Sequence, residues 1–322
     1  MGRHTLVLLY AHCNPGVSME LSHHQKGVDR PTLIFDTAAG PGSPEHYYHL
    51  LHGYLLPAAH FLNTCDKPPK VLNMRSCGPV MDTIVHEFFS WLDADVRLVD
   101  PNSADYLHPR NPIILPRWER IVKRAGQVRL FKTLLGSIDS EPQEAEIQHL
   151  LSVRTAIIEH LMQGTVSTAI ESEEHDKGEV LLLRRSPEPA YYAADGTAEI
   201  PGYGAERRQL LSLEETALQL RDLGLRTRIF EPGAATLEEQ VRAFHAAAGV
   251  IGIRGAELAN IVWMRPQARV IAIAPLKILL GRPLAPQHAL SWFLDVHYLQ
   301  VPVFRKYVKL SADRLYRAYR RE

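Results

Sequence analysis

A tight, glycine-rich turn is the part of the sequence best suited to hold an anion. It lies within residues 249–263, which read GVIGIRGAELANIVW, between a short apolar run and a helical pattern. The N–H groups at the start of a helix have no partner inside the helix, and they attract phosphate. Arg254 and Glu257 lie in the turn itself. The glycine spacing differs from the dinucleotide fingerprint, so a nicotinamide dehydrogenase is not expected.

Further arginines follow the other predicted strands of this half. Arg184 and Arg185 end an apolar run, and Arg207 and Arg208 lie in the loop before the next helix. Ligands of an open parallel sheet bind beyond the carboxyl ends of its strands, where arginines can clamp a diphosphate. The alternative is a set of surface salt bridges. The acidic residues available for them are Glu206, Glu231, Glu238 and Glu257.

Three histidines in the first half could accept a proton. His46, His49 and His52 lie in a helical pattern over residues 46–62, three residues apart on adjoining parts of one face. Histidine titrates near neutral pH, which suits a general base. We expect His49 to be the base. The alternative is a histidine packed in the helix against Tyr47 or Tyr48, and a zinc site is disfavoured because helical zinc pairs are spaced by four residues.

The second half alternates short apolar runs with helical patterns joined by short loops. This order predicts a doubly wound α/β domain with a parallel sheet. Capping boxes, Ser212 with Glu215 and Thr236 with Glu239, mark two helix starts. The expected strands are 179–185, 225–232, 249–253 and 269–275, and the expected helices are 212–224, 236–249 and 256–264.

The first half has a less regular α/β pattern. Strands are expected within 5–10, 31–36, 69–74, 93–100 and 111–116, and helices within 46–62 and 146–162. A chain of 322 residues exceeds the usual size of one hydrophobic core. A polar, acidic segment at 164–179 is the expected connection. The predicted domains are therefore 1–165 and 166–310, followed by a basic terminal helix, 311–322, capped by Ser311.

Composition excludes several classes of protein. Lysine plus arginine and aspartate plus glutamate both number 36, so nothing points to a nucleic-acid partner. The three cysteines, Cys13, Cys65 and Cys77, lack metal-site spacing and fit a reducing compartment. The apolar run near the N-terminus is too short to span a membrane. A cytoplasmic protein is expected.

The basic C-terminal segment raises one membrane alternative. Its lysines and arginines alternate with Tyr307, Tyr316 and Tyr319, as in helices that lie on a lipid surface. This pattern predicts a peripheral membrane contact. The competing interpretation, which we favour, is a solvated terminal helix packed on the protein.

Several spaced motifs over residues 184–275 resemble the catalytic domain of glycosyltransferase family 61. A weaker resemblance covers the helix 46–62, where Tyr47, Tyr48, His49 and Pro57 match. The matching residues of the second half are Arg184, Arg185, Arg207 or Arg208, Glu239, Gln240, Val241, Gly255, Ala256, Leu258, Asn260, Met264 and Pro266.

The resemblance implies a GT-B type fold, with two Rossmann-like domains facing each other across a cleft. The C-terminal domain would bind the nucleotide-sugar, and the N-terminal domain the glycan or lipid-linked acceptor. Family members are inverting transferases that move xylose, arabinose or N-acetylglucosamine from UDP, without a catalytic metal or another cofactor. The implied donor-binding set is Arg184, Arg185, Arg207, Arg208, Glu239, Gln240, Gly255, Ala256, Glu257, Leu258 and Asn260, and the acceptor-side set is His46, Tyr47, Tyr48 and His52.

Two departures from the family pattern leave alternatives open. Arg254 replaces the family's histidine and would stabilise the departing UDP, and Gly53 replaces an acidic residue. One alternative is a non-catalytic relative that binds nucleotide-sugars or glycans. The other is a metal-dependent GT-A-like transferase that uses Asp93 and Asp95, although a helix-to-strand turn explains this pair more simply.

Overall fold

The computed structural model describes residues 30–34, 44–92, 94–114, 118–135, 141–163, 178–187, 205, 208–276, 286–305 and 307–320. The expected strand 5–10, Asp93, Arg207 and nearly all of the expected connection 164–179 lie outside the described residues.

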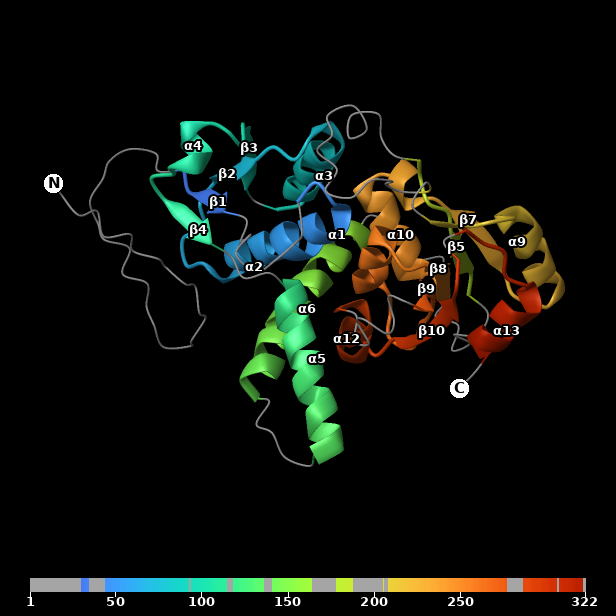
Figure 1. Ribbon diagram of the computed structural model, residues 1–322. Coiled ribbons are helices and arrows are strands. Elements are labelled where there is room, and N and C mark those ends of the chain that lie inside the picture. The colour runs from blue at the N-terminus through green and yellow to red at the C-terminus, as the bar shows by residue number, and fades with distance from the viewer. Residues whose placement is uncertain are drawn as a thin grey trace.

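The first sheet is parallel and has the strand order β3-β2-β1-β4 (Figure 1). Its strands are β1 (Thr32–Ile34), β2 (Val71–Arg75), β3 (Asp95–Val99) and β4 (Pro112–Ile114). Each overlaps a predicted strand, with β2 ending one residue beyond its predicted range, so the α/β pattern of this half is confirmed. Two further helices, α3 (Pro79–Ser90) and α4 (Ala104–Leu107), lead into β3 and β4.

The helix predicted over 46–62 forms, but it changes type along its length. It consists of α1 (Tyr47–Leu50), a π-helical turn η1 (Leu51–Leu55) and α2 (Leu56–Thr64). All five residues of the π turn are buried. Such turns are rare and shift the side chains that follow to another face of the helix, frequently at functional sites.

The second sheet is also parallel and has the order β10-β9-β8-β5-β7. Its predicted strands are confirmed, and one further strand, at residues 297–303, was not predicted. The strands are β5 (Val180–Leu183), β7 (Thr227–Phe230), β8 (Gly249–Ile253), β9 (Arg269–Pro275) and β10 (His297–Val303). Both faces of this sheet are buried, which explains the nearly continuous apolar runs of its strands.

The helices of the second half are α9 (Leu213–Asp222), α10 (Leu237–Ala246), the 3₁₀ helix η4 (Ala256–Trp263), α12 (Pro286–Phe293) and α13 (Ala312–Arg320). The short helix η3 (Pro232–Ala234) follows β7, and β6 (Gln209–Leu210) pairs with β11 (Tyr307–Val308). The helix expected over 256–264 is therefore 3₁₀ rather than α.

Only one of the two predicted capping boxes forms. Thr236 accepts a hydrogen bond from the Glu239 N–H, and Glu239 accepts one from the Thr236 N–H. Ser212 makes no such bond, because its backbone is left-handed with φ 55°. Glu215 instead accepts a bond from Lys309. The predicted capping box of Ser212 with Glu215 was therefore wrong.

The terminal helix α13 packs on the second sheet. Ser311 caps it as predicted, since its hydroxyl accepts a hydrogen bond from the Arg314 N–H at 3.3 Å. Leu315 and Tyr319 are buried, and the Tyr319 ring lies so close to Gly249 that a Cβ there would be 2.4 Å from it. The apolar face of α13 is thus covered by protein, as in the interpretation favoured above, and the peripheral membrane contact stays a prediction. None of the described helices is long and apolar enough to cross a bilayer.

Two long helices connect the halves. They are α5 (Trp118–Leu135) and α6 (Glu141–Met162), which lie side by side below the junction of the halves in Figure 1. Helix α6 packs against α2, α10 and η4, and α5 packs against α12. One hydrophobic cluster contains buried residues of both halves, among them Leu33, Met74, Leu181 and Trp263. The domain boundaries 1–165, 166–310 and 311–322 stay a prediction.

Candidate functional site

The 3₁₀ helix η4 carries the predicted anion-binding turn at its start, and its other end is fixed by side chains of α6 and α10. Arg154 donates from Nε to the Val262 carbonyl and from Nη2 to the Met264 carbonyl. His245 Nδ1 lies 3.1 Å from the Trp263 carbonyl oxygen. Burial lowers the pKa of Arg154 to about 10, which leaves it charged at neutral pH. The carbonyl groups that a helix end leaves open therefore have partners.

The middle of η4 is held by a buried chain of hydrogen bonds. Asn260 is completely buried and donates from Nδ2 to Gln240 Oε1 at 2.7 Å. Its Oδ1 accepts from the Tyr47 hydroxyl at 2.6 Å. Three predicted ligand-binding residues thus meet, but as a structural link between the halves. Asn260 and Gln240 are therefore buried and bonded within the protein, and their role as donor contacts stays a prediction.

Two more members of the predicted donor set have structural roles. Leu258 is completely buried in the core. Glu239 completes the capping box at the start of α10. These motif residues of α10 and η4 therefore help to place η4, and their role in donor binding stays a prediction.

His52 fixes the π turn to η4. It is 2% exposed, and its Nε2 lies 3.2 Å from the Ala259 carbonyl oxygen. Burial is the main reason that its pKa falls to about 4, with a smaller contribution from His49. The ring is therefore neutral at pH 7, and its Nε2–H donates to Ala259. His52 thus links the two halves, and its place on the acceptor side stays a prediction.

His46, Tyr48 and His49 are half-buried and form the accessible part of the predicted acceptor side. The His49 ring packs edge-on against His46 and Tyr48, with centroid distances of 6.1 Å and 5.2 Å. Among the described residues, no group of three histidine, cysteine or acidic side chains is placed to hold a metal. Asp95, the described half of the Asp93–Asp95 pair, opens β3 and so lies at the amino end of the first sheet.

The turn before η4 contains a nearly buried ion pair. Arg185 donates from Nε to Glu257 Oε1 at 2.9 Å, and their side chains are only 8% and 13% exposed. The pair covers Gly255, where a Cβ would lie 2.5 Å from Glu257 Oε2 and 3.1 Å from Arg185 Cζ. A larger residue at this position would displace the Glu257 and Arg185 side chains from the pair. Arg185 Nη1 and Glu257 Oε2 are buried and have no partner within the described part of the chain.

The same turn leaves two backbone donors at the start of η4. The first hydrogen bond of the helix runs from the Leu258 N–H to the Gly255 carbonyl at 3.3 Å. The N–H groups of Ala256 and Glu257 precede it in the chain, as expected at a helix start. N–H groups at a helix start can bind an anion.

Arg254 lies beside residues that the sequence did not suggest. Arg254 is 8% exposed. Its backbone N–H donates to the Ile273 carbonyl at 2.8 Å, next to the β8–β9 pairing. Burial lowers the pKa of His288, and the positive charge of Arg254 lowers it further. The His288 ring stacks on Tyr298 at 5.1 Å. Nothing local in α12 or β10 signals that these side chains meet Arg254.

The remaining predicted arginines differ from Arg185. Arg184 pairs with Glu214 at the surface, since the two side chains are 40% and 70% exposed. This arginine forms a surface salt bridge, as the alternative interpretation expects, and its assignment to the donor site stays a prediction. Arg208 is half-buried directly before β6.

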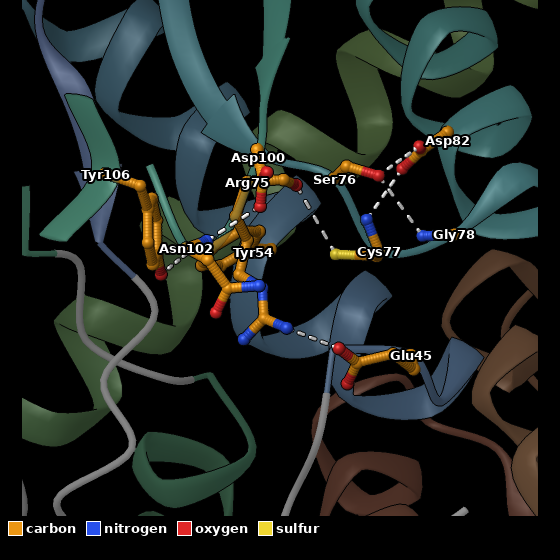
Figure 2. A network of polar contacts seen from close by, with 10 residues as sticks. All are labelled: Glu45, Tyr54, Arg75, Ser76, Cys77, Gly78, Asp82, Asp100, Asn102 and Tyr106. Atoms are coloured by element: carbon orange, nitrogen blue, oxygen red, sulfur yellow. Dashed lines mark hydrogen bonds and ion pairs between the residues drawn. The ribbon is translucent and has the colours of Figure 1, made fainter. Parts of the chain in front are cut away.

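A second group of polar residues gathers at the carboxyl edge of the first sheet (Figure 2). Arg75, the last residue of β2, donates from Nη2 to Glu45 at 2.5 Å. Asp82 fixes the turn that follows, because it accepts bonds from the Cys77 N–H at 2.7 Å and the Ser76 hydroxyl at 2.6 Å. The sequence analysis did not select Glu45 or Arg75. Their positions beside the YYH run and at a strand end were the available signals.

The comparisons with known proteins agree with the sequence resemblance. A family model described as Glycosyltransferase 61 matches residues 47–271, which is more than half of the 322 residues. A search of curated proteins found no significant match. The matched range includes the helix with Tyr47 and His49, the Arg185–Glu257 pair and the whole of η4. The chain belongs to the glycosyltransferase 61 family.

Proposed function

We propose that this protein is an inverting glycosyltransferase that moves a sugar from a nucleotide-sugar, with UDP as the expected nucleotide, to a hydroxyl of a glycan or glycoconjugate. Family membership supports glycosyl transfer. The observation that carries the donor site is the nearly buried Arg185–Glu257 pair over Gly255. We also propose that the two parallel sheets form the facing domains of a GT-B arrangement.

In this proposal the diphosphate binds at the start of η4. Arg185 Nη1 and the N–H groups of Ala256 and Glu257 donate to its oxygens, and Arg254 adds positive charge. Preorganised donors of this kind stabilise the charge that grows on a leaving group. Glu257 Oε2, as an acceptor, suits a hydroxyl of the donor sugar rather than a phosphate oxygen.

The transfer step then needs a base but no metal. The acceptor oxygen attacks the anomeric carbon from the face opposite the diphosphate, and the carbon–oxygen bond to UDP breaks. His49 takes the proton of the acceptor hydroxyl. It is better suited than His52, because His49 is half-buried whereas His52 is engaged with Ala259.

Donor binding tests the proposal. A thermal-shift screen of UDP, GDP, CMP and TDP sugars identifies the nucleotide, since a ligand raises the stability of the state it binds. Calorimetric titration should then show affinity about tenfold or more weaker in Arg185→Ala and in Arg254→Ala, because a bond to a charged group is worth about 1.5–3 kcal/mol. Arg184→Ala is the matched control and should bind normally, because Arg184 pairs with exposed Glu214. Unchanged affinity in Arg185→Ala would contradict the donor site.

Turnover tests the rest of the mechanism. His49→Ala should abolish transfer while donor binding is retained, and near-normal turnover would place the base elsewhere. EDTA should have little effect, and strong inhibition would favour the metal-dependent alternative with Asp93 and Asp95. Tight UDP binding without UDP release from any donor–acceptor mixture would assign the protein to the non-catalytic alternative.

A further inference from the structure

Arg75 has hydrogen-bonding capacity that the described part of the chain does not use. Its side chain is 21% exposed, and Glu45 receives one bond from Nη2. Its buried Nε and its Nη1 bond none of the described residues. A guanidinium has five N–H groups in a fixed plane, so several of them remain for another molecule. The Tyr106 ring lies beside this guanidinium, with 5.9 Å between Cζ and the ring centroid.

The surroundings hold these side chains in place. The Ser76 N–H donates to the Val99 carbonyl at 2.8 Å, which extends the β2–β3 pairing past Arg75. The Tyr106 and Tyr54 hydroxyls are 3.4 Å apart, and Tyr54 donates to the Leu33 carbonyl at 3.2 Å. Tyr54 belongs to the π turn, so this turn supports the Arg75 group in addition to holding His52 (Figure 2). A binding site benefits when its side chains are fixed before the ligand arrives.

The Arg75–Glu45 pair is connected to η4 through helix α1. Glu45 precedes Tyr47 by two residues, and the Tyr47 hydroxyl bonds Asn260 of η4. Helix α1 also packs directly on η4. Arg75 is the last residue of β2 and therefore lies at the carboxyl edge, where parallel sheets bind ligands.

We propose that Arg75, Glu45 and Tyr106 form a subsite for a neutral sugar of the acceptor, an inference that rests on the proposed function. The charges decide the ligand class. A carboxylate or phosphate bound to Arg75 would lie close to the Glu45 carboxylate and be repelled by it. A sugar hydroxyl can accept from Arg75 and donate to Glu45 at once. The Tyr106 ring offers an apolar face to the sugar's C–H groups.

Saturation-transfer NMR with small glycosides tests the subsite. The probes are methyl glycosides of neutral hexoses and pentoses, with methyl glucuronide as the acidic probe. The native protein should transfer saturation to at least one neutral glycoside, and Arg75→Gln should weaken its binding about fivefold or more, as expected for a lost bond of about 1 kcal/mol. Arg97→Gln is the control and should bind normally, because Arg97 and Asp105 form an exposed pair, 3.9 Å apart, near the same sheet.

Glu45→Gln makes the charge argument testable without removing a large side chain. It should weaken binding of the neutral glycoside and strengthen binding of methyl glucuronide. No neutral glycoside bound by the native protein, unchanged binding in both variants, or a native preference for methyl glucuronide would each overturn the subsite.

UDP affinity, measured on the same samples, separates this inference from the proposed function. It should stay unchanged in Arg75→Gln and Glu45→Gln, which also shows that the variants are folded. UDP binding that fell together with glycoside binding would overturn the assignment to a separate subsite. Absence of nucleotide binding in the native protein would refute the donor proposal, whereas the glycoside measurements do not depend on it.

Discussion

His46, His49 and His52 share a residue type and a regular spacing, but the fold gives them different chemistry. The π turn between α1 and α2 directs His52 onto Ala259, where the ring is buried and neutral. His46 and His49 precede the turn and stay half-buried. Sequence spacing assumes a regular α-helix, so it could not separate these three side chains.

The buried His52 should make the stability of the protein depend on pH. Its pKa is about 4 in the folded state, against an ordinary value of 6.5 for histidine. As pH falls from 6.5 to 4, His52 binds a proton in the unfolded chain but stays largely neutral in the folded protein. The free energy of unfolding therefore falls by roughly 3 kcal/mol. Above pH 6.5 the ring is neutral in both states, so this part of the free energy of unfolding is fully present.

Urea unfolding of the native protein and His52→Gln at pH 7 and pH 4 measures this contribution. The variant should lose roughly 3 kcal/mol less over this range. His245 and His288, whose pKa values are also lowered by burial, are present in both proteins and cancel in the comparison. Parallel pH profiles would show that His52 is not the group responsible.

Other predicted site residues have partners within the protein that the sequence did not indicate. Asn260 and Gln240 match family motifs, and the structure uses them to join the halves. Arg184 and Arg185 are adjacent, yet one is a surface ion pair and the other a nearly buried one. Side chains alternate between the two sides of an extended backbone. Adjacent arginines such as these two therefore face opposite sides, although the prediction gave both the same role. Glu45 and Arg75 lie far apart in the sequence, so only the fold shows that they meet.

At the scale of the elements, the two capping patterns show how one motif can have two outcomes. Thr236 has an extended backbone and bonds the Glu239 N–H, whereas Ser212 is left-handed with φ 55° and bonds no helix N–H. We expect Thr236→Ala to lower the free energy of unfolding by about 1 kcal/mol. Ser212→Gly should be neutral or stabilising, because glycine adopts this conformation without strain. Urea unfolding measures both variants. Equal losses of unfolding free energy in Thr236→Ala and Ser212→Gly would contradict the conclusion that only Thr236 caps its helix.

Helix α10 has a second cap, supplied from the other half of the chain. Glu87 of α3 accepts from the Leu237 N–H at 2.9 Å and from the Glu238 N–H at 2.6 Å. Glu87→Gln should cost roughly 1–2 kcal/mol of stability, since one charge-assisted bond and the favourable charge at the helix start are lost. Glu238→Gln, the control, loses a part-exposed pair with Arg242 and should cost about 0.5 kcal/mol or less. Similar urea midpoints for the two variants would argue against the cap.

The strands were the most predictable elements, because buried parallel strands are short, apolar and bounded by turns. The strands β5, β7, β8 and β9 all lie where these runs predict them. The missed elements lack such a signal. Strand β10 is only partly buried, and the 3₁₀ form of η4 follows from contacts with Tyr47, Arg154 and His245 that no local pattern contains.

At the scale of the whole molecule, the two halves share their interior. One hydrophobic cluster joins Leu33 and Met74 of the first sheet to Leu181 of the second sheet and to Trp263 of η4. Separating the halves would expose this apolar surface to water, at a cost of about 25 cal/mol per Å². It would also break the Tyr47–Asn260–Gln240 chain. The fold therefore couples the stability of one half to that of the other.

This coupling predicts that the protein unfolds in one cooperative transition. Scanning calorimetry should give a single peak whose calorimetric and van't Hoff enthalpies agree. Asn260→Ala leaves the Tyr47 hydroxyl and the Gln240 carbonyl without their buried partner, at a cost of roughly 3 kcal/mol. It should lower the midpoint of the whole peak, because neither half keeps its core without the other. Two resolved peaks, with only one shifted by Asn260→Ala, would show instead that segments such as 1–165 and 166–310 fold independently.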